Sequence, residues 1–86
     1  MSAEPAQLAD DGTPVLDCRG ELCPVPVVHL ARHLAAAPGD EVLLLVDDPA
    51  AEADVPAFCR LRAHEHLGVE AGPDGSRRHH VRRSRP

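Results

Sequence analysis

The hydrophobic pattern of the chain begins after Pro14 and soon changes its period. Residues 15–18 (Val-Leu-Asp-Cys) predict a short strand, and residues 19–22 form the loop that follows it. Beyond Pro24, apolar residues recur at spacings of three and four, which predicts an amphipathic helix that ends at Pro38-Gly39. The residues on its apolar side are Val27, Leu30, Ala31, Leu34 and Ala35.

The middle of the chain predicts a second strand and a second helix. Glu41–Val46 is an almost continuous aliphatic run, which is typical of a strand in the middle of a sheet rather than at its edge. Asp54 is a good helix N-cap and Pro56 suits the first turn, so we expect the second helix to begin near Asp54. Its apolar side then carries Val55, Phe58, Cys59 and Arg62.

The last part of the chain predicts two strands joined by a turn. From His64 the period is two, which places Leu67, Val69 and Ala71 on one face and His66, Gly68 and Glu70 on the other. Residues 72–75 (Gly-Pro-Asp-Gly) are a turn, and residues 76–83 a polar strand. The order is therefore βαβαββ, with the first two strands parallel through a right-handed crossover. We expect an α+β fold: a two-layer α/β sandwich with a four-stranded mixed sheet and two helices on one face.

The length and the charge distribution indicate one domain with two short ends. The 86 residues suffice for one small core, which we assign to a single domain over residues 14–83. Residues 1–13 lack a sustained apolar period and are interpreted as a flexible tail, and residues 84–86 as a basic end. Of the net charge of −5, residues 1–76 carry −10 and residues 77–86 carry +5. We interpret the basic segment as solvated, with a contact arm for an acidic partner or RNA as the alternative.

The composition excludes several chemistries. The chain has no Lys, hence no Schiff-base or phosphate-loop lysine, and without Trp or Tyr it lacks the usual platform for stacking bases, so we expect no direct nucleic-acid binding. The longest apolar run is too short to cross a bilayer and the acidic start is unlike a signal peptide, so we expect a cytoplasmic protein without membrane partners. Three cysteines in a reducing compartment favour core, metal-binding or catalytic thiols over disulfides.

Cys23 is the strongest candidate for chemistry, because it lies where the first loop meets the first helix. With Cys23 as N-cap, Pro24 and Pro26 take the first and third helical positions, where a missing N–H costs no hydrogen bond. The helix dipole then favours the thiolate, and its effect of about 0.3–1 kcal/mol lowers the pKa of a thiol from about 8.5 to about 8. The alternative is that Cys23 is a small buried side chain.

Three charged residues are expected near this thiol. Asp47 and Asp48 follow the second strand, and parallel strands end on the same edge of a sheet, so both are expected beside Cys23. They recognise a partner or handle protons, or alternatively they cap the second helix and shape the turn before Pro49. Arg19 pairs with these carboxylates or stabilises an anionic sulfur, with a solvated loop arginine as the alternative.

The remaining cysteines and the histidines are assigned structural roles. Cys18 faces the core and Cys59 lies on the apolar side of the second helix, so both are interpreted as buried thiols; the alternative for Cys18 is a resolving thiol for Cys23. The histidines form pairs that fall short of the three or four ligands of a metal site, so we expect them to be solvated and to bind no metal. These pairs are His29 with His33, His64 with His66, and His79 with His80.

The pattern resembles the TusA/SirA family of sulfur carrier proteins. Its most specific part is residues 16–27 (Leu-Asp-Cys-Arg-Gly-Glu-Leu-Cys-Pro-Val-Pro-Val), in which Cys-Pro-x-Pro follows Arg-Gly. Further matching positions are Asp47-Asp48-Pro49, Asp54, Phe58-Cys59-Arg60 and His64. The family often has Trp where this chain has Phe58, which keeps the apolar anchor. It also has Gly where this chain has Ala63, and Ala is unfavourable at a helix end with a positive backbone angle.

The resemblance implies a two-layer α/β domain in which Cys23 accepts sulfane sulfur as a persulfide and hands it to another protein. The implied partners are a persulfide donor protein, such as a cysteine desulfurase or a rhodanese-like protein, and a sulfur-acceptor protein. No cofactor is required, because the sulfur is bound to Cys23 itself. Family members act in tRNA thiolation, molybdenum-cofactor pathways and sulfur oxidation. We expect the partner to be bound around Cys23 by Arg19, Gly20, Pro24, Pro26, Asp47 and Asp48.

The covalent carrier is thus the leading hypothesis, as a carrier more than a turnover enzyme. Two hypotheses from other classes stay open. The same fold serves a thiol-disulfide redox module that uses Cys18 and Cys23, or a non-catalytic regulatory module that binds a partner through the acidic edge.

Overall fold

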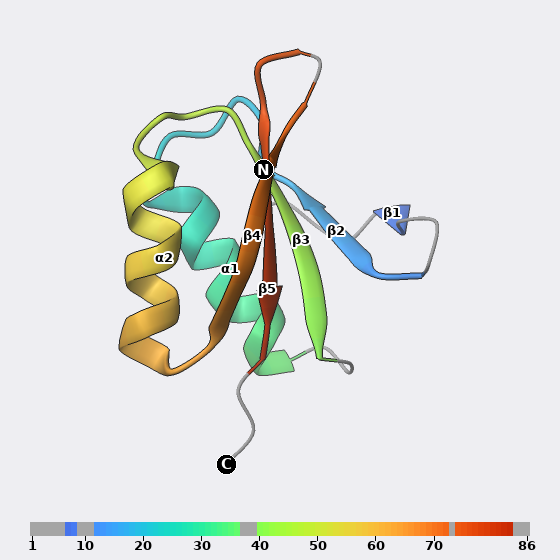
Figure 1. Cartoon of the computed structure of the whole chain (residues 1–86), viewed down its shortest axis with the longest axis vertical. Helices are drawn as coiled ribbons and strands as arrows, with labels where there is room; N and C mark the ends of the chain where they lie inside the picture. The colour runs from blue at the N-terminus through green and yellow to red at the C-terminus, as the bar shows by residue number, and fades with distance from the viewer. Residues whose placement is uncertain (1–6, 9–11, 37–39, 73, 84–86) are drawn as a thin grey trace.

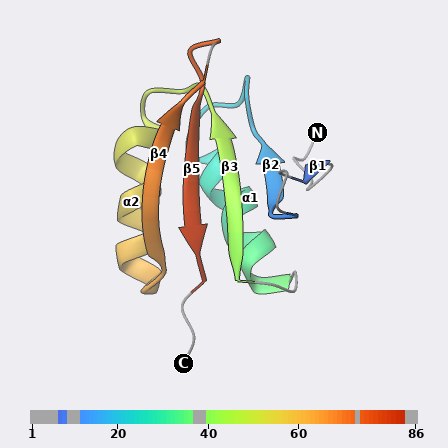
Figure 2. The same cartoon turned by 45° about the vertical axis from the view of Figure 1, so that its right-hand side comes forward.

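The computed structural model describes residues 7–8, 12–36, 40–72 and 74–83 and confirms the α+β sandwich (Figure 1). One sheet, in the order β1-β2-β3-β5-β4, is formed by β1 (Gln7–Leu8), β2 (Pro14–Asp17), β3 (Glu41–Val46), β4 (Glu65–Ala71) and β5 (Arg77–Arg82). β2 and β3 run parallel, and the other neighbours run antiparallel. Helices α1 (Val25–Ala36) and α2 (Ala51–Arg62) cover the same face of the sheet (Figure 2). The predicted order βαβαββ and the interior position of β3 are confirmed.

Strand β1 is an addition to this order that the sequence pattern did not predict. Its residues pair with β2, Gln7 opposite Val15 and Leu8 opposite Pro14. A strand of two residues is too short to carry a periodic signal. The rest of the expected tail before Gly12, the expected helix end at Pro38-Gly39 and the basic end at residues 84–86 lie outside the described residues.

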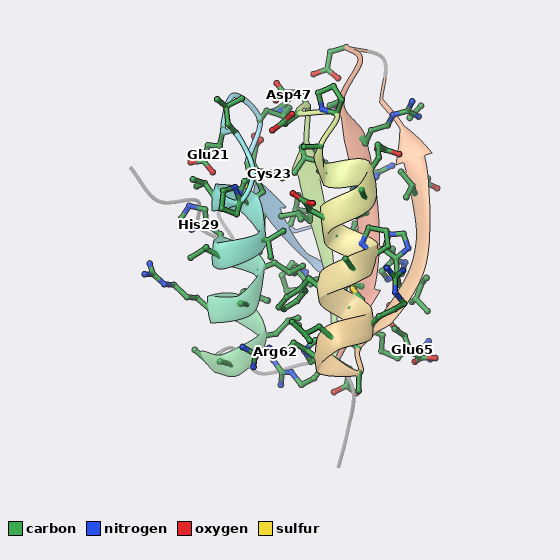
Figure 3. All side chains as sticks on the ribbon, turned by 90° about the vertical axis from the view of Figure 1, so that its left-hand side faces the viewer. Glu21, Cys23, His29, Asp47, Arg62 and Glu65 are labelled. Atoms are coloured by element: carbon green, nitrogen blue, oxygen red, sulfur yellow. The ribbon has the colours of Figure 1, made fainter. Side chains whose placement is uncertain are left out.

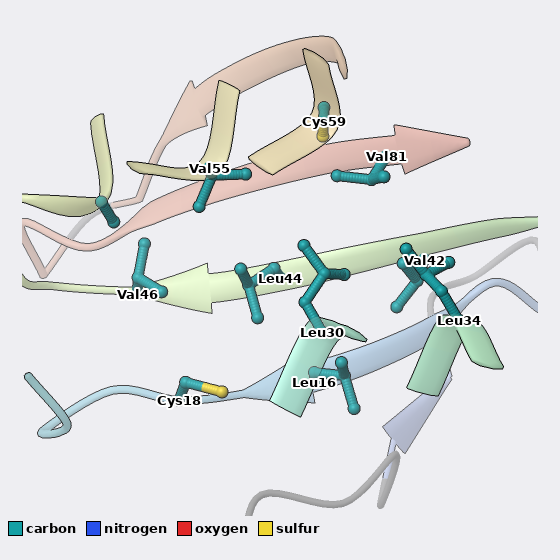
Figure 4. Close-up of a cluster of buried hydrophobic side chains, with 11 residues drawn as sticks. Leu16, Cys18, Leu30, Leu34, Val42, Leu44, Val46, Val55, Cys59 and Val81 are labelled. Carbon is teal, nitrogen blue, oxygen red and sulfur yellow. The ribbon is translucent and has the colours of Figure 1, made fainter. Parts of the chain in front are cut away.

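The core lies between the helices and one face of the sheet (Figure 4). Alternate residues of β3 are buried, because the other face of the sheet carries no helix among the described residues. Cys18 and Cys59 are buried as expected, and Phe58 packs against the cluster from α2. The aliphatic members of the cluster are Leu16, Leu30, Leu34, Val42, Leu44, Val46, Ala51, Val55 and Val81. Full burial of each Leu or Val side chain contributes about 1.5–3 kcal/mol, so this layer holds the site elements together.

Helix α2 begins earlier than expected, and the assignment of Asp54 as its N-cap is wrong. The Asp54 N–H donates to the Ala50 carbonyl at 3.0 Å, so Ala50 is the N-cap and Asp54 lies in the first turn. Asp48 shapes the start instead, since its Oδ1 accepts the Ala50 N–H at 3.1 Å. Pro56 therefore lies inside the helix and offers no N–H to the preceding turn. Because Asp48 takes the turn-forming role, the carboxylate of Asp54 is available for another contact.

The C-terminal end of α2 closes at Ala63, which adopts the left-handed conformation with φ 61° and ψ 28°. The Ala63 N–H donates to the Arg60 carbonyl at 3.3 Å, and the His64 N–H to the Cys59 carbonyl at 2.8 Å. These two bonds form a Schellman motif, in which Gly is the preferred residue. Ala63 therefore has the positive φ that makes this position unfavourable for Ala.

A β-bulge in β4 changes which residues share a face of the sheet. His66 pairs with Val81 and Gly68 with His80, so Leu67 is the extra residue. Paired residues of an antiparallel ladder share a face, and Val69 pairs with His79. His66 and Val69 thus lie on the helix-covered face and Leu67 on the open face. The strict alternation expected from His64 onward is wrong, because the bulge inserts one residue.

His79 is fully buried on the helix-covered face, so its expected solvation is wrong. Its Nδ1 lies 2.9 Å from His66 Nε2, and its Nε2 lies 3.6 Å from the Glu52 carboxylate of α2. Burial and the neighbouring His66 lower the pKa of His79. Burial also lowers the pKa of His33, His64 and His66. The native fold therefore favours these imidazoles in their neutral form.

The first prediction concerns Ala63→Gly, which we expect to raise the free energy of unfolding by about 0.5–1 kcal/mol, because Gly has no Cβ to oppose a positive φ. Urea unfolding followed by circular dichroism measures the change. Ala57→Gly, at an exposed position inside the same helix, is the matched control and should lower the value by about 1 kcal/mol. A less stable Ala63→Gly variant would contradict the left-handed closure of α2.

A second prediction follows from the neutral histidines. A depressed pKa contributes stability that is fully present above the unfolded value of about 6.5 and is lost as the pH falls through the folded pKa. The free energy of unfolding should therefore decrease from pH 7.5 to pH 5.5. His79→Leu removes the most buried of these groups, so its decrease over the same interval should be smaller. Equal decreases in both proteins would show that His79 does not titrate with unfolding.

Candidate functional site

Cys23 lies in the loop between β2 and α1, next to the first turn of the helix (Figure 3). The Val28 N–H donates to the Pro24 carbonyl at 3.0 Å, so Pro24, and not Cys23, is the N-cap of α1. A turn whose Val25 N–H donates to the Leu22 carbonyl at 3.0 Å, with a cis Cys23–Pro24 peptide bond, precedes the helix. Cys23 thus stands one position farther from the helix than expected, and its side chain is partly exposed.

Asp47 and Asp48 fasten this loop to the end of β3. Both carboxylate oxygens of Asp47 accept the Gly20 N–H, at 3.0 and 3.1 Å. Asp48 Oδ2 accepts the Cys23 N–H at 2.8 Å, while its Oδ1 accepts the Ala50 N–H. These two bonds lower the pKa of Asp48, which keeps the side chain ionised. Asp48 lies beside Cys23 as expected, Asp47 holds the same loop at Gly20, and the bonds of both to backbone N–H groups position the loop.

Arg19 pairs with Asp17 and Asp74 rather than with Asp47 or Asp48. Its guanidinium makes two bonds to Asp17, at 2.9 and 2.7 Å, and one to Asp74 at 3.0 Å. Asp74 belongs to the turn between β4 and β5, so this ion pair joins two loops that are distant in the sequence. The bonds to Ser76 and Arg19 lower the pKa of Asp74 to about 2. The expected pairing of Arg19 with Asp47 or Asp48 is wrong, because Asp17 and Asp74 occupy its donors.

The electrostatics of the Cys23 sulfur are opposite to the expectation from the helix dipole. Burial, followed by repulsion from Asp54, a hydrogen bond to Asp54 and repulsion from Asp48, raises the pKa of Cys23 to about 11. A dipole effect of about 0.3–1 kcal/mol fades within the first turn, and Cys23 lies outside that turn. The expected pKa near 8 is therefore wrong. In the free protein at pH 7, the site holds a neutral thiol.

The other two cysteines offer no comparable access. Cys18 is 0% exposed, and burial together with Glu21 raises its pKa to about 12. Cys59 is 1% exposed, and burial raises its pKa. Of the three cysteines, Cys23 alone has its side chain partly exposed. A reagent or a partner protein therefore reaches Cys23 first.

The sequence pattern did not assign two acidic residues, Asp54 and Glu21, to the site. Asp54, in the first turn of α2, is one of the negative groups that add to burial in raising the pKa of Cys23. Glu21 adds to burial in raising the pKa of Cys18, and its Oε1 lies 3.5 Å from His29 Nε2. The signal for Asp54 was the Asp48-Pro49 turn, which starts α2 early and frees Asp54 from capping. Nothing in the spacing of Glu21 pointed to its contacts.

The arginines of β5 are neutralised by neighbouring carboxylates. Arg78 pairs with Glu70 at 2.7 Å, and Arg82 with Glu41 and Glu65 at 3.5 and 3.3 Å.

Within the described part of the chain, no group of three or more His, Cys, Asp or Glu side chains is arranged to hold a metal ion. In the same part, no helix is long and apolar enough to cross a membrane.

The fold and the site together define a small two-layer α/β domain that presents one accessible thiol on a loop fastened by carboxylates. The family model described as Sulfurtransferase TusA matches residues 15–83. The chain therefore belongs to the TusA family of sulfurtransferases. The role of this family is that of a sulfur carrier, which interacts with sulfur donor and acceptor proteins.

A third prediction tests the fastening of the loop. Asp48→Ala removes the acceptor of two backbone N–H groups and should lower the free energy of unfolding by about 1–2 kcal/mol, whereas Asp48→Asn keeps an acceptor oxygen and should lower it less. Hydrogen exchange of the Cys23 amide, followed by NMR, should accelerate in Asp48→Ala more than in Asp48→Asn. Unchanged exchange in both variants would show that Asp48 does not hold the loop.

Proposed function

We propose that the protein carries sulfane sulfur as a persulfide on Cys23, between a donor protein and an acceptor protein. The observation that supports this role most directly is the accessibility of Cys23 beside two buried cysteines. A carrier must expose the loaded sulfur, because both transfers take place inside another protein. The family membership supports the class of reaction, and the loop supports Cys23 as its site.

The proposed transfer is a thiol exchange without net oxidation. The Cys23 thiolate attacks the terminal sulfur of a donor persulfide, a new S–S bond forms at Cys23, and the S–S bond of the donor breaks. The donor leaves as its thiolate and takes up a proton. An acceptor thiol then attacks the terminal sulfur on Cys23 in the same way, which restores the Cys23 thiol. No cofactor enters either step.

An apolar ridge next to Cys23 supports docking of a protein rather than capture of a small molecule. The ridge consists of Leu22, Val25 and Val28, of which Leu22 is 73% exposed and the two valines are each 42% exposed. It runs from the Cys23 loop along the outer side of α1. Neighbouring exposed aliphatic side chains are typical of a protein contact surface. We propose that the ridge packs against the donor and the acceptor while Cys23 enters their active sites.

We propose a cysteine desulfurase or a rhodanese-like protein as donor, and tRNA thiolation or another sulfur-trafficking route as the destination of the sulfur. The cytoplasm is the proposed location, because the reaction needs a reduced Cys23. This carrier role takes precedence over a redox pair of Cys18 and Cys23, since Cys18 is fully buried and its pKa is raised to about 12.

The fourth prediction tests the loading of Cys23. Incubation with a cysteine desulfurase and cysteine, without a strong reductant, should add about 32 Da to the intact mass, the mass of one sulfur atom. Cys23→Ser should abolish this addition. Cys18→Ala and Cys59→Ala are the matched controls and should keep it, while each loses about 1 kcal/mol of stability with its buried thiol.

Other outcomes separate the competing functions. Equal loading of Cys23→Ser would exclude Cys23 as the carrier site. A loss of about 2 Da without sulfur addition, abolished by Cys18→Ala, would instead identify a Cys18–Cys23 disulfide and a redox module.

A further inference from the structure

A groove of about 200 Å³ lies at the end of the helix pair that is remote from Cys23. It is lined by residues of the last turns of α1 and α2 and by residues that directly follow α2 and β5. Its apolar lining consists of Ala31, Leu34, Ala35 and Phe58. Figure 3 shows Arg62 at this end of the helices and Cys23 at the other. A helix of 12 residues is about 18 Å long, so the groove does not overlap the Cys23 loop.

The rest of the lining is basic. It consists of Arg62 in the last turn of α2, His64 after that helix and Arg83 after β5. The His64 ring lies against Phe58, with ring centres 5.8 Å apart, so the polar and apolar parts of the lining adjoin. Within the described residues, the Arg62 guanidinium makes no hydrogen bond or ion pair, in contrast to the paired arginines of β5.

The charges that act on this end of the molecule are positive. Burial, followed by repulsion from Arg83 and Arg62, lowers the pKa of His64. Burial, followed by repulsion from Arg83, lowers the pKa of His33 on α1. Guanidinium groups beside an aliphatic wall suit a ligand that carries a carboxylate next to an aliphatic group.

Size and net charge favour a protein segment as this ligand. The volume lies below the roughly 300–1,000 Å³ of most small-molecule sites, so the groove suits a side chain rather than a cofactor-sized ligand. The net charge of −5 opposes the approach of a polyanion such as RNA. A short acidic and aliphatic peptide segment brings a single carboxylate to the arginines and fills the apolar part of the groove.

We propose that the groove binds an acidic, aliphatic segment of a partner protein, with Arg62 as the anchor of its carboxylate and Phe58 against its aliphatic part. Arg83 belongs to the basic segment 77–86, for which contact with an acidic partner was an open alternative. A partner bound in the groove leaves Cys23 accessible, and so retains the protein between two sulfur transfers. This consequence rests on the proposed carrier function, whereas the binding itself does not.

Peptide titrations followed by ¹H–¹⁵N NMR test the site. The probe acetyl-Leu-Glu-Leu-amide should shift the amide signals of residues 31–36 and 58–64, with a Kd of about 1 mM. Acetyl-Leu-Gln-Leu-amide lacks the charge and acetyl-Gly-Glu-Gly-amide lacks the aliphatic groups, so each should bind about fivefold more weakly or less. Equal affinity of all three peptides would overturn the proposed recognition.

Two arginine variants separate the anchor from the net charge. Arg62→Gln should weaken binding of the charged peptide by about fivefold and leave the uncharged peptide unaffected. Arg60→Gln is the matched control, because it removes the same charge from the last turn of α2 at a residue that does not line the groove. It should change the affinity by less than about twofold. Equal losses in both variants would attribute the effect to net charge and overturn the site.

Measurements on the wild-type protein decide the proposal independently of the variants. Signal shifts confined to other parts of the chain would overturn it, and equal or tighter binding of free isovalerate would assign the groove to a small carboxylate instead of a protein segment. Saturation with the charged peptide should change the rate of Cys23 alkylation by iodoacetamide by less than about twofold. A larger change would overturn the independence of the groove from Cys23. No arm involves sulfur loading, so failure here leaves the carrier function to be judged by the desulfurase experiment.

Discussion

The bridge made by the Asp48 carboxylate determines the geometry of the site. One oxygen holds the Cys23 amide and the other holds the Ala50 amide, so one side chain fixes the loop before α1 and the start of α2. A carboxylate that accepts two backbone N–H groups stays ionised and has little freedom to rotate. The position of Cys23 and the early start of α2 both depend on this bridge. The parallel pairing of β2 with β3 brings its two ends within reach.

The surroundings of Cys23 account for an apparent contradiction between its position and its reactivity. A thiol beside a helix N-terminus is commonly activated, yet burial of Cys23, followed by the charges of Asp54 and Asp48, outweighs the dipole. At a pKa of about 11, the thiolate is about one part in ten thousand at pH 7. For a carrier this low reactivity is useful, because a thiol that is exposed between encounters otherwise reacts with any electrophile. The terminal sulfur of a persulfide stands about 2 Å beyond Sγ.

The sequence predicted the architecture because aliphatic runs and helical spacings report local structure well. β3 and the apolar face of α1 follow from such runs, and the edge that gathers Cys23, Asp47 and Asp48 follows from the parallel topology. The errors arose at residues whose side chains suit the same local role. Asp48 and Asp54 both suit the start of a helix, and only the folded loop shows which of them caps it. The raised pKa of Cys23 and the pairing of Arg19 with Asp74 depend on contacts between distant segments, which periodicity does not encode.

The bulge at Leu67 has a consequence for the behaviour of the protein at high concentration. β4 is an outer strand of the sheet, and its free edge is a template on which a second chain could add. The extra residue breaks the even spacing of N–H and C=O groups along that edge. Two copies aligned edge to edge would thus meet a mismatch in register. Strand β4 thus disfavours the addition of a second chain at its edge, while the Cys23 loop stays open to successive partners.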